Sequence, residues 1–223
     1  MKTVIARSVF FPLLILALAC KREDVAPVQV PGSRPAANSR PASEPGQPDQ
    51  SLTVMDTSEK AVLTVTTSGS SVTIEYTDTS GTHQMTGSSR DSGKRKYESA
   101  SGAVAEVKPG DDGFKVRTPD GKLLWKVKFK EEKIKVSDNE ENNNPFVLSL
   151  KHAPRVEVLD SSEHSLGELR VDGSTTSLRD ASGGERFRVK SAKTSAASAI
   201  MLVEQIPLAQ RAIIAGELYA RGK

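Results

Sequence analysis

The strongest constraint on the fold is an alternation of apolar and polar residues that starts near Leu52 and continues over most of the chain. The segment 72–77 reads Val-Thr-Ile-Glu-Tyr-Thr, which places every second side chain on the same face of an extended strand. Turn residues such as Ser68-Gly69-Ser70 separate segments of this kind at intervals of roughly ten residues. The pattern therefore predicts a succession of half-buried β-strands.

Two hairpins are marked most clearly. Leu63 and Val65 lie on the other side of the 68–70 turn from segment 72–77 and are expected to form its partner strand. Segment 123–130 follows a Pro-Asp-Gly-Lys turn and alternates apolar residues with lysines. Between residues 78 and 103 the pattern is weaker and predicts only two short edge strands. Because no helical segments interrupt the strands, we expect an antiparallel meander that closes into a barrel or a sandwich.

A helical pattern appears only at the end of the chain. A first segment is expected from about 195 to 203, and a second from Pro207 to about Arg221. In the second segment Gln210, Glu217 and Arg221 form one narrow polar stripe, while most of the circumference is apolar, as in a buried helix. The predicted fold class is therefore mainly β, with a buried C-terminal α-helix that either fills a barrel or covers an open face of a sheet.

Two Asp-Gly turns, at 120–121 and 172–173, and the hydrophobic helix containing 208–216 resemble the tubby-like superfamily. This superfamily includes phospholipid scramblases and LURP-one-related proteins. The resemblance covers about residues 104–221 and implies a closed antiparallel barrel around a central C-terminal helix. The first third of the domain lies outside it, and no functional residue of the family is carried over to this chain.

The first twenty residues have the layout of an export signal, with Lys2 and Arg7 before an apolar run at 9–18 that is too short to span a membrane. The run ends Leu-Ala-Leu-Ala-Cys, which resembles the lipobox of bacterial lipoprotein precursors, with Ala17 where leucine is commonest. The resemblance implies cleavage after Ala19, lipidation of the Cys20 thiol and acylation of the new amine with a chain such as palmitate. The alternative is an ordinary secretory signal with an incidental cysteine.

These observations divide the chain into a signal peptide (1–19), a tether (20–51) and a β-rich domain (52–223). The tether holds six of the twelve prolines and is expected to be disordered, because it cannot bury enough apolar surface. Cys20 is the only cysteine, so lipidation gives it a use that an intramolecular disulfide cannot. The expected location is the cell envelope, at the outer membrane facing the periplasm if the host has two membranes.

Charge and motifs exclude several functions. Removing Lys2 and Arg7 with the signal leaves 29 bases against 28 acids, and a chain so close to neutrality is not expected to bind nucleic acid. His83, His152 and His164 show no metal-ligand spacing. No glycine-rich phosphate loop follows a strand. We therefore expect no metal and no cofactor.

Two loops contain chemically capable residues. Segment 160–164 combines serines, carboxylates and His164, but no nucleophile elbow accompanies it, so it is interpreted as a solvated turn. Segment 138–144 is rich in oxygen ligands but lacks the central glycine of a calcium loop, and is interpreted as a plain loop. Neither segment motivates an enzyme.

Basic residues recur on the polar faces of the expected strands. They either keep a solvated face soluble and block edge pairing, or form a cationic face for anionic lipid headgroups or an envelope protein. The sequence thus predicts a non-enzymatic, membrane-anchored binding or scaffold module. The alternatives are a carrier of an apolar ligand inside a barrel and an unrecognised hydrolase. The bases are Lys115, Arg117, Lys126, Lys128, Lys130, Lys133, Lys135, Arg186 and Arg188.

Overall fold

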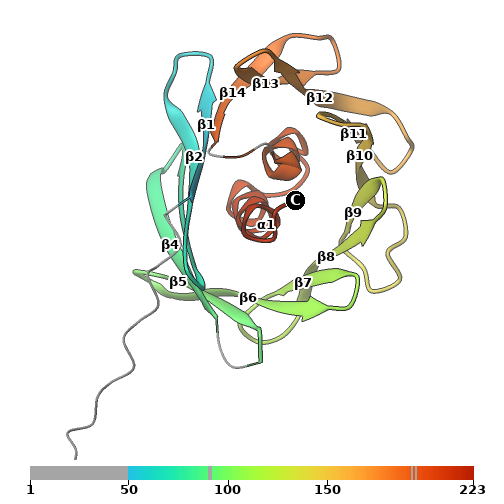
Figure 1. Ribbon diagram of the computed structural model, residues 1–223. Helices are drawn as coiled ribbons and strands as arrows, with labels where there is room; N and C mark the ends of the chain where they lie inside the picture. The colour runs from blue at the N-terminus through green and yellow to red at the C-terminus, as the bar shows by residue number, and fades with distance from the viewer. Residues whose placement is uncertain (1–49, 90–91, 192, 194) are drawn as a thin grey trace, which may run out of the picture. The chain divides into compact units, whose positions relative to one another are not determined.

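The computed structural model describes residues 50–89, 92–191, 193 and 195–223. Fourteen strands in these residues form one closed antiparallel barrel, in which each strand pairs with its neighbours in sequence and the last pairs with the first (Figure 1). The expected mainly β fold is confirmed, and it is a barrel rather than a sandwich. The predictions for Ala19, for Cys20 and for the tether up to residue 49 lie outside the described residues, whereas residues 50 and 51 of the expected tether belong to the first strand.

The strands follow one another with short connections. They are β1 (Gln50–Asp56), β2 (Ala61–Ser68), β3 (Ser71–Asp78), β4 (Gly81–Ser89), β5 (Arg95–Ser99), β6 (Gly102–Gly110), β7 (Gly113–Arg117), β8 (Leu123–Lys130), β9 (Lys133–Ser137), β10 (Phe146–His152), β11 (Arg155–Leu159), β12 (Ser165–Asp172), β13 (Thr175–Asp180) and β14 (Glu185–Ser191).

Two helical segments occupy the barrel interior, as the view down the barrel shows (Figure 1). The first, η1 (Ala196–Leu202), is a 3-10 helix whose N-cap, Ser195, accepts a hydrogen bond from the backbone N–H of Ala197. The second, α1 (Leu208–Ala220), begins directly after Pro207 and is buried along most of its length. The predicted buried C-terminal helix is confirmed, and it fills the barrel.

The interior is built from the apolar side of every strand. The predicted partner strand of segment 72–77 is β2, in which Val65 pairs with Ile74 of β3, and both side chains are fully buried. Together with residues of η1 and α1 these side chains make one continuous hydrophobic core. Because the alternation must bury one face of each strand against the helices, a shift of one residue would turn the apolar set to solvent.

Two strands lie between 78 and 103, as predicted, but the prediction that they are short edge strands was wrong for the length of β4 and for the edge position of both. β4 is nine residues long, and both β4 and β5 are paired on each side because the closed barrel has no edge. The apolar signal of β4 is weak because its inward position opposite Tyr97 is Gly87. A Cβ there would come within 2.6 Å of the Tyr97 ring, so the space that an apolar side chain would fill belongs to Tyr97.

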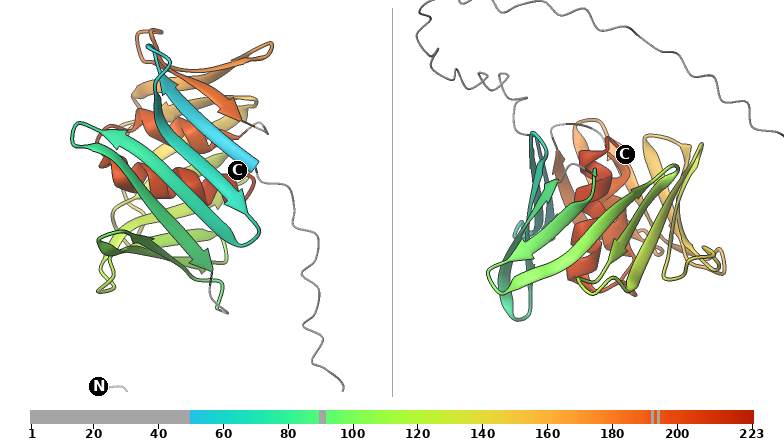
Figure 2. Two further views of the ribbon diagram at one scale, coloured as in Figure 1. Left: turned by 90° about the vertical axis from the view of Figure 1, so that its left-hand side faces the viewer. Right: turned by 90° about the horizontal axis from the view of Figure 1, so that it is seen from below.

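Successive connections fall at opposite ends of the barrel, because all strands are antiparallel. We call the end where β1 begins at Gln50 the entry end, and the other the far end. The C-terminal residues also lie at the entry end, where the Tyr219 hydroxyl donates to the carbonyl of Ser51 at 2.7 Å (Figure 2). At the far end, near the start of α1, the Trp125 indole N–H donates to Gln210 at 2.6 Å.

Candidate anion-contact surface and buried polar network

Seven of the nine predicted bases lie on β7, β8 and β9, which are neighbours in the barrel. Their side chains alternate with the buried residues of these strands and therefore lie on the outer wall. β6 adds Lys108, which the sequence analysis did not single out. We call this set the basic wall: Lys108, Lys115, Arg117, Lys126, Lys128, Lys130, Lys133 and Lys135.

Bases oppose bases across this wall. Lys115 pairs in register with Lys126 on one side and with Lys108 on the other. Lys128 opposes Lys135, and Lys130 opposes Lys133. Like charges directly opposite each other destabilise a sheet, so this arrangement carries a cost in the free energy of folding that neutral residues would avoid.

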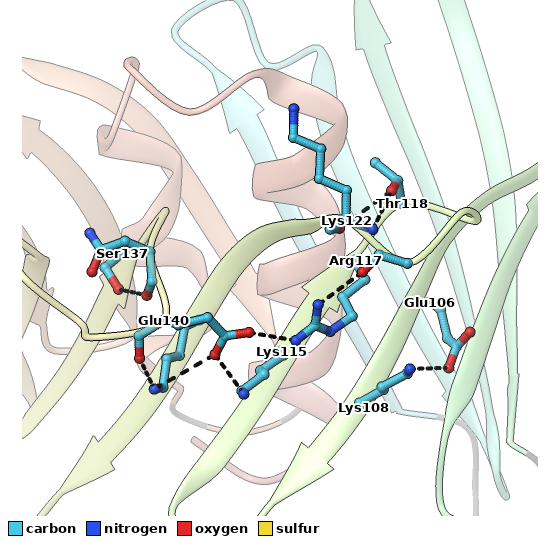
Figure 3. A network of polar contacts seen from close by, with 11 residues as sticks. Glu106, Lys108, Lys115, Arg117, Thr118, Lys122, Ser137 and Glu140 are labelled. Carbon is cyan, nitrogen blue, oxygen red and sulfur yellow. Dashed lines mark hydrogen bonds and ion pairs between the residues drawn. The ribbon is translucent and has the colours of Figure 1, made fainter.

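One acid of the β9–β10 connection offsets part of the repulsion (Figure 3). Glu140 contacts Lys115 at 2.6 Å and Arg117 at 2.5 Å, and its backbone carbonyl accepts a hydrogen bond from Lys126. The hydrogen bond from Lys115, together with that from Arg117, lowers the pKa of the Glu140 carboxyl. Glu140 therefore stays charged and holds Lys115, Arg117 and Lys126 close together toward the far end of the barrel.

The rest of the wall is less neutralised. Lys128 contacts Asp112 at 3.2 Å, and the same contact lowers the pKa of that carboxyl. In the described part of the chain, Lys130, Lys133 and Lys135 have no ion pair within 4.0 Å. The uncompensated charge of the wall thus lies toward the entry end.

The two remaining predicted bases lie elsewhere. Arg186 and Arg188 are on β14, which pairs with β13 and β1 and is far from β9 in the strand order. Arg186 contacts Glu204 at 2.8 Å, and Arg188 contacts Glu185 at 2.7 Å. The nine bases therefore do not share one surface.

A second polar cluster is buried inside the barrel, around Glu217 of α1. Its fully buried carboxylate accepts hydrogen bonds from Arg95 at 2.6 Å and Tyr97 at 2.9 Å, both on β5, and from Arg221 at 3.0 Å. Burial raises the pKa of the Tyr97 hydroxyl, so that group stays protonated as a donor. Burial alone would lower the pKa of Arg95, but the Glu217 carboxylate outweighs it and the pKa lies above its usual value. The cluster ties α1 to the barrel wall.

The sequence analysis placed Gln210, Glu217 and Arg221 on one stripe but did not identify their partners. The stripe meets the wall through Trp125 near one end and through Arg95 near the other. These partners are 85 and 122 residues away along the chain. A pattern in the local sequence cannot predict contacts between residues so far apart along the chain.

The contacts of His83 and His164 differ from those of a catalytic triad. In the β3–β4 turn both the Ser80 hydroxyl and the Asp78 carboxylate contact Nε2 of His83, at 2.9 and 3.1 Å. A catalytic triad needs the serine and the acid on opposite ring nitrogens. His164 is 79% exposed and contacts Asp160 through Nδ1 at 3.3 Å, as part of a solvated turn.

The 138–144 segment closes on itself. Asn139 donates to the carbonyl of Asn143 and accepts from its N–H, and the carboxylate of Glu140 is directed to the basic wall. Within the described residues, no group of three or more His, Cys, Asp or Glu side chains is arranged to hold a metal ion. Among the same residues, no helix is both long and apolar enough to cross a membrane.

The fold and its surfaces define a class: an antiparallel β-barrel filled by its own C-terminal helix and carrying a basic outer wall. No family model, curated protein or solved structure matches this chain.

Proposed function

We propose that this chain is a lipid-anchored envelope protein whose barrel is a non-enzymatic binding or scaffold module for an anionic membrane surface. The observation that carries the proposal is the base-against-base register of β6 to β9. The Cys20 lipid would hold the domain near the bilayer, and the basic wall would contact anionic headgroups. In a two-membrane host this places it at the outer membrane, facing the periplasm.

The register favours contact over simple solvation. Four cross-strand pairs oppose like charges where the alternation demands only a polar residue. Each base near an anionic membrane contributes about 1 kcal/mol of attraction. The bases without an ion pair, Lys130, Lys133 and Lys135, are therefore expected to contribute most.

The two alternative functions have less support. A carrier needs an internal cavity for its apolar ligand, but η1 and α1 pack into one core with the inward side chains. A hydrolase needs an ordered nucleophile, base and acid, and the contacts of His83 and His164 do not supply that geometry.

The test is co-sedimentation of chain 20–223 carrying Cys20→Ser, and therefore no lipid, with vesicles of neutral or anionic phospholipid. We expect binding to anionic vesicles only, weakened by salt because charges are screened over about 10 Å at 0.1 M. Lys130→Glu with Lys135→Glu should abolish most of it.

The matched control is Lys60→Glu with Lys190→Glu, which makes the same change in net charge at exposed positions outside the wall. Equal loss of binding in both double variants would show a response to net charge alone and count against the wall. Absence of binding to every vesicle would reject the membrane-contact function.

A further inference from the structure

The two ends of the barrel carry opposite charge. At the far end, the connections and the strand residues that flank them hold twelve acids and three bases, and the η1–α1 connection is included because Glu204 reaches Arg186 there. The acids are Asp56, Glu59, Asp78, Asp120, Asp138, Glu140, Glu141, Asp160, Glu163, Asp180, Glu185 and Glu204, and the bases are Lys60, Arg117 and Lys122.

The entry end is basic by the same definition. Its described residues hold eight bases and five acids. Two of the acids are paired with bases of the barrel wall, since Asp112 contacts Lys128 and Asp172 contacts Arg170. Three of the bases are paired with acids outside this set, Arg95 and Arg221 with Glu217 and Arg155 with Glu168. Among these described residues the unpaired remainder is five bases and three acids, so the entry end keeps a net positive charge. The bases are Lys94, Arg95, Lys130, Lys133, Arg155, Lys193, Arg221 and Lys223, and the acids are Asp111, Asp112, Glu131, Glu132 and Asp172.

The acidic charge at the far end is fixed by turn geometry. Asp56, Asp160 and Asp180 each accept hydrogen bonds from backbone N–H groups two and four residues later. These bonds hold the carboxylates in place and favour their charged form. The position of the charge at these three of the twelve acids is therefore held by the backbone of the turns.

The basic end is also where the chain enters the barrel. β1 starts there at Gln50, so the 29 residues between Cys20 and this point join the barrel at this end. A pocket of about 280 Å³ opens beside the start of β1. Arg95 and Lys193 contribute to its lining, and no acid does.

We infer that the entry end rests against the anionic bilayer that holds the lipid anchor, with the far end pointing away. The inference rests on the proposed function, because it needs the anchored Cys20. It adds the orientation of the barrel relative to the bilayer. In this orientation Lys130 and Lys133 belong both to the basic wall and to the docked entry end. The occupant of this surface is the anionic phospholipid of the anchoring membrane.

The two orientations of the barrel differ in how far the acids of the far end lie from the bilayer, and therefore in electrostatic energy. A strand of eight residues spans about 26 Å at roughly 3.3 Å per residue, whereas charge is screened within about 10 Å at 0.1 M salt. With the entry end docked, the twelve acids lie beyond the reach of the negative surface. An inverted barrel would press them against it.

The experiment uses the lipidated full chain in vesicles that contain headgroup-quencher lipid. A dye is placed on a new cysteine at the entry end, Ser174→Cys, or at the far end, Ser101→Cys; the lipid blocks the thiol of Cys20. We expect the entry-end dye alone to be quenched, in anionic but not in neutral vesicles, and high salt to reverse the effect. Equal quenching of both dyes, or stronger quenching of the far-end dye, would overturn the orientation.

Charge-reversal variants provide a second test of the orientation. Lys94→Glu with Lys223→Glu should lower the equilibrium constant for docking by about fivefold per base. Lys60→Glu with Lys122→Glu makes the same change in net charge at exposed positions of the far end and should leave that constant unchanged. No difference between these variants would overturn the inference. Flotation of the lipidated chain with neutral vesicles separates the two proposals: a chain that fails to float counts against the anchor and the proposed function, whereas a chain that floats without oriented quenching counts against the orientation alone.

Discussion

Nη1 of Arg95 and Oε1 of Glu217 lie 2.6 Å apart inside the barrel, although the two residues are 122 positions apart in sequence. Arg95 comes from the wall and Glu217 from the enclosed helix, and the carboxylate is fully buried. A charge in this position is tolerated only with its partners. The pair therefore fixes the rotation of α1 inside the barrel.

Removing the carboxylate should unfold the protein more easily. We expect Glu217→Leu to lower the free energy of unfolding by about 3–5 kcal/mol, because it leaves the guanidinium of Arg95 buried without its partner. Urea unfolding measures this, followed by the fluorescence of Trp125, which is the chain's single tryptophan and contacts α1 directly.

Glu75→Gln is the control, since Glu75 is exposed on β3 and its substitution should stay within about 0.5 kcal/mol. Combining Glu217→Leu with Arg95→Met should cost less than the two single changes together, because each removes the other's unpaired group. A single-variant loss below about 1 kcal/mol would contradict the buried ion pair.

Gly167 is required where β12 crosses close to β13. Its φ is +142°, and a Cβ would lie 2.1 Å from the carbonyl oxygen of Arg179. Gly167→Ala should therefore cost at least about 3 kcal/mol, from backbone strain and overpacking. Gly173 also has positive φ, but nothing lies within 4 Å of its Cβ position, so Gly173→Ala should cost about 1–2 kcal/mol. Thermal unfolding compares them, and equal losses would show that the close approach is absent.

The alternation predicted most strands and their inward faces because a period of two residues is a local property. It underestimated the length of β4, where Gly87 leaves its space to Tyr97. Closure was not predictable in the same way, because Val54 of β1 pairs with Val189 of β14. Sequence spacing carries no information on that register, so barrel and sandwich stayed open alternatives.

The same limit applies to the sites. Bases at every second position of consecutive strands had to share a wall, which is why those of β7, β8 and β9 come together. Arg186 and Arg188 fall outside this wall because closure sets β14 beside β1. The polar stripe of α1 was visible from its helical spacing, whereas Arg95 and Tyr97 could be assigned to it only once the strands enclosed the helix.

Acid should destabilise the far end. Hydrogen bonds from Ser80 lower the pKa of Asp78 from 3.8 to about 2. Bonds from Ser58, His164 and Ser182 lower those of Asp56, Asp160 and Asp180. A depressed native pKa means that the unfolded chain binds more protons, so this stability is fully present above about pH 4 and is lost as pH falls toward 2.

Urea midpoints measured between pH 6 and pH 2 check this dependence. Asp78→Asn should flatten part of the decline, because the asparagine side chain does not titrate in this range. A midpoint that stays constant to pH 2 in the unmodified protein would contradict the prediction.

The last prediction concerns the proposed lipid anchor at Cys20. If Cys20 is acylated, Cys20→Ser removes both the lipid and the processing site, so the product should be retained uncleaved or released in soluble form. Two acyl chains suffice for stable membrane attachment, since each buried methylene contributes about 0.8 kcal/mol, so the unmodified chain should stay with the membrane at high salt. Metabolic labelling with a palmitate analogue, followed by membrane fractionation, distinguishes the unmodified chain from Cys20→Ser.

The control is the variant that carries Lys130→Glu and Lys135→Glu with Cys20 intact. It should still be labelled and membrane-bound, because these changes leave the lipidation site intact. Persistent labelling and membrane binding of Cys20→Ser would assign the attachment to another part of the chain.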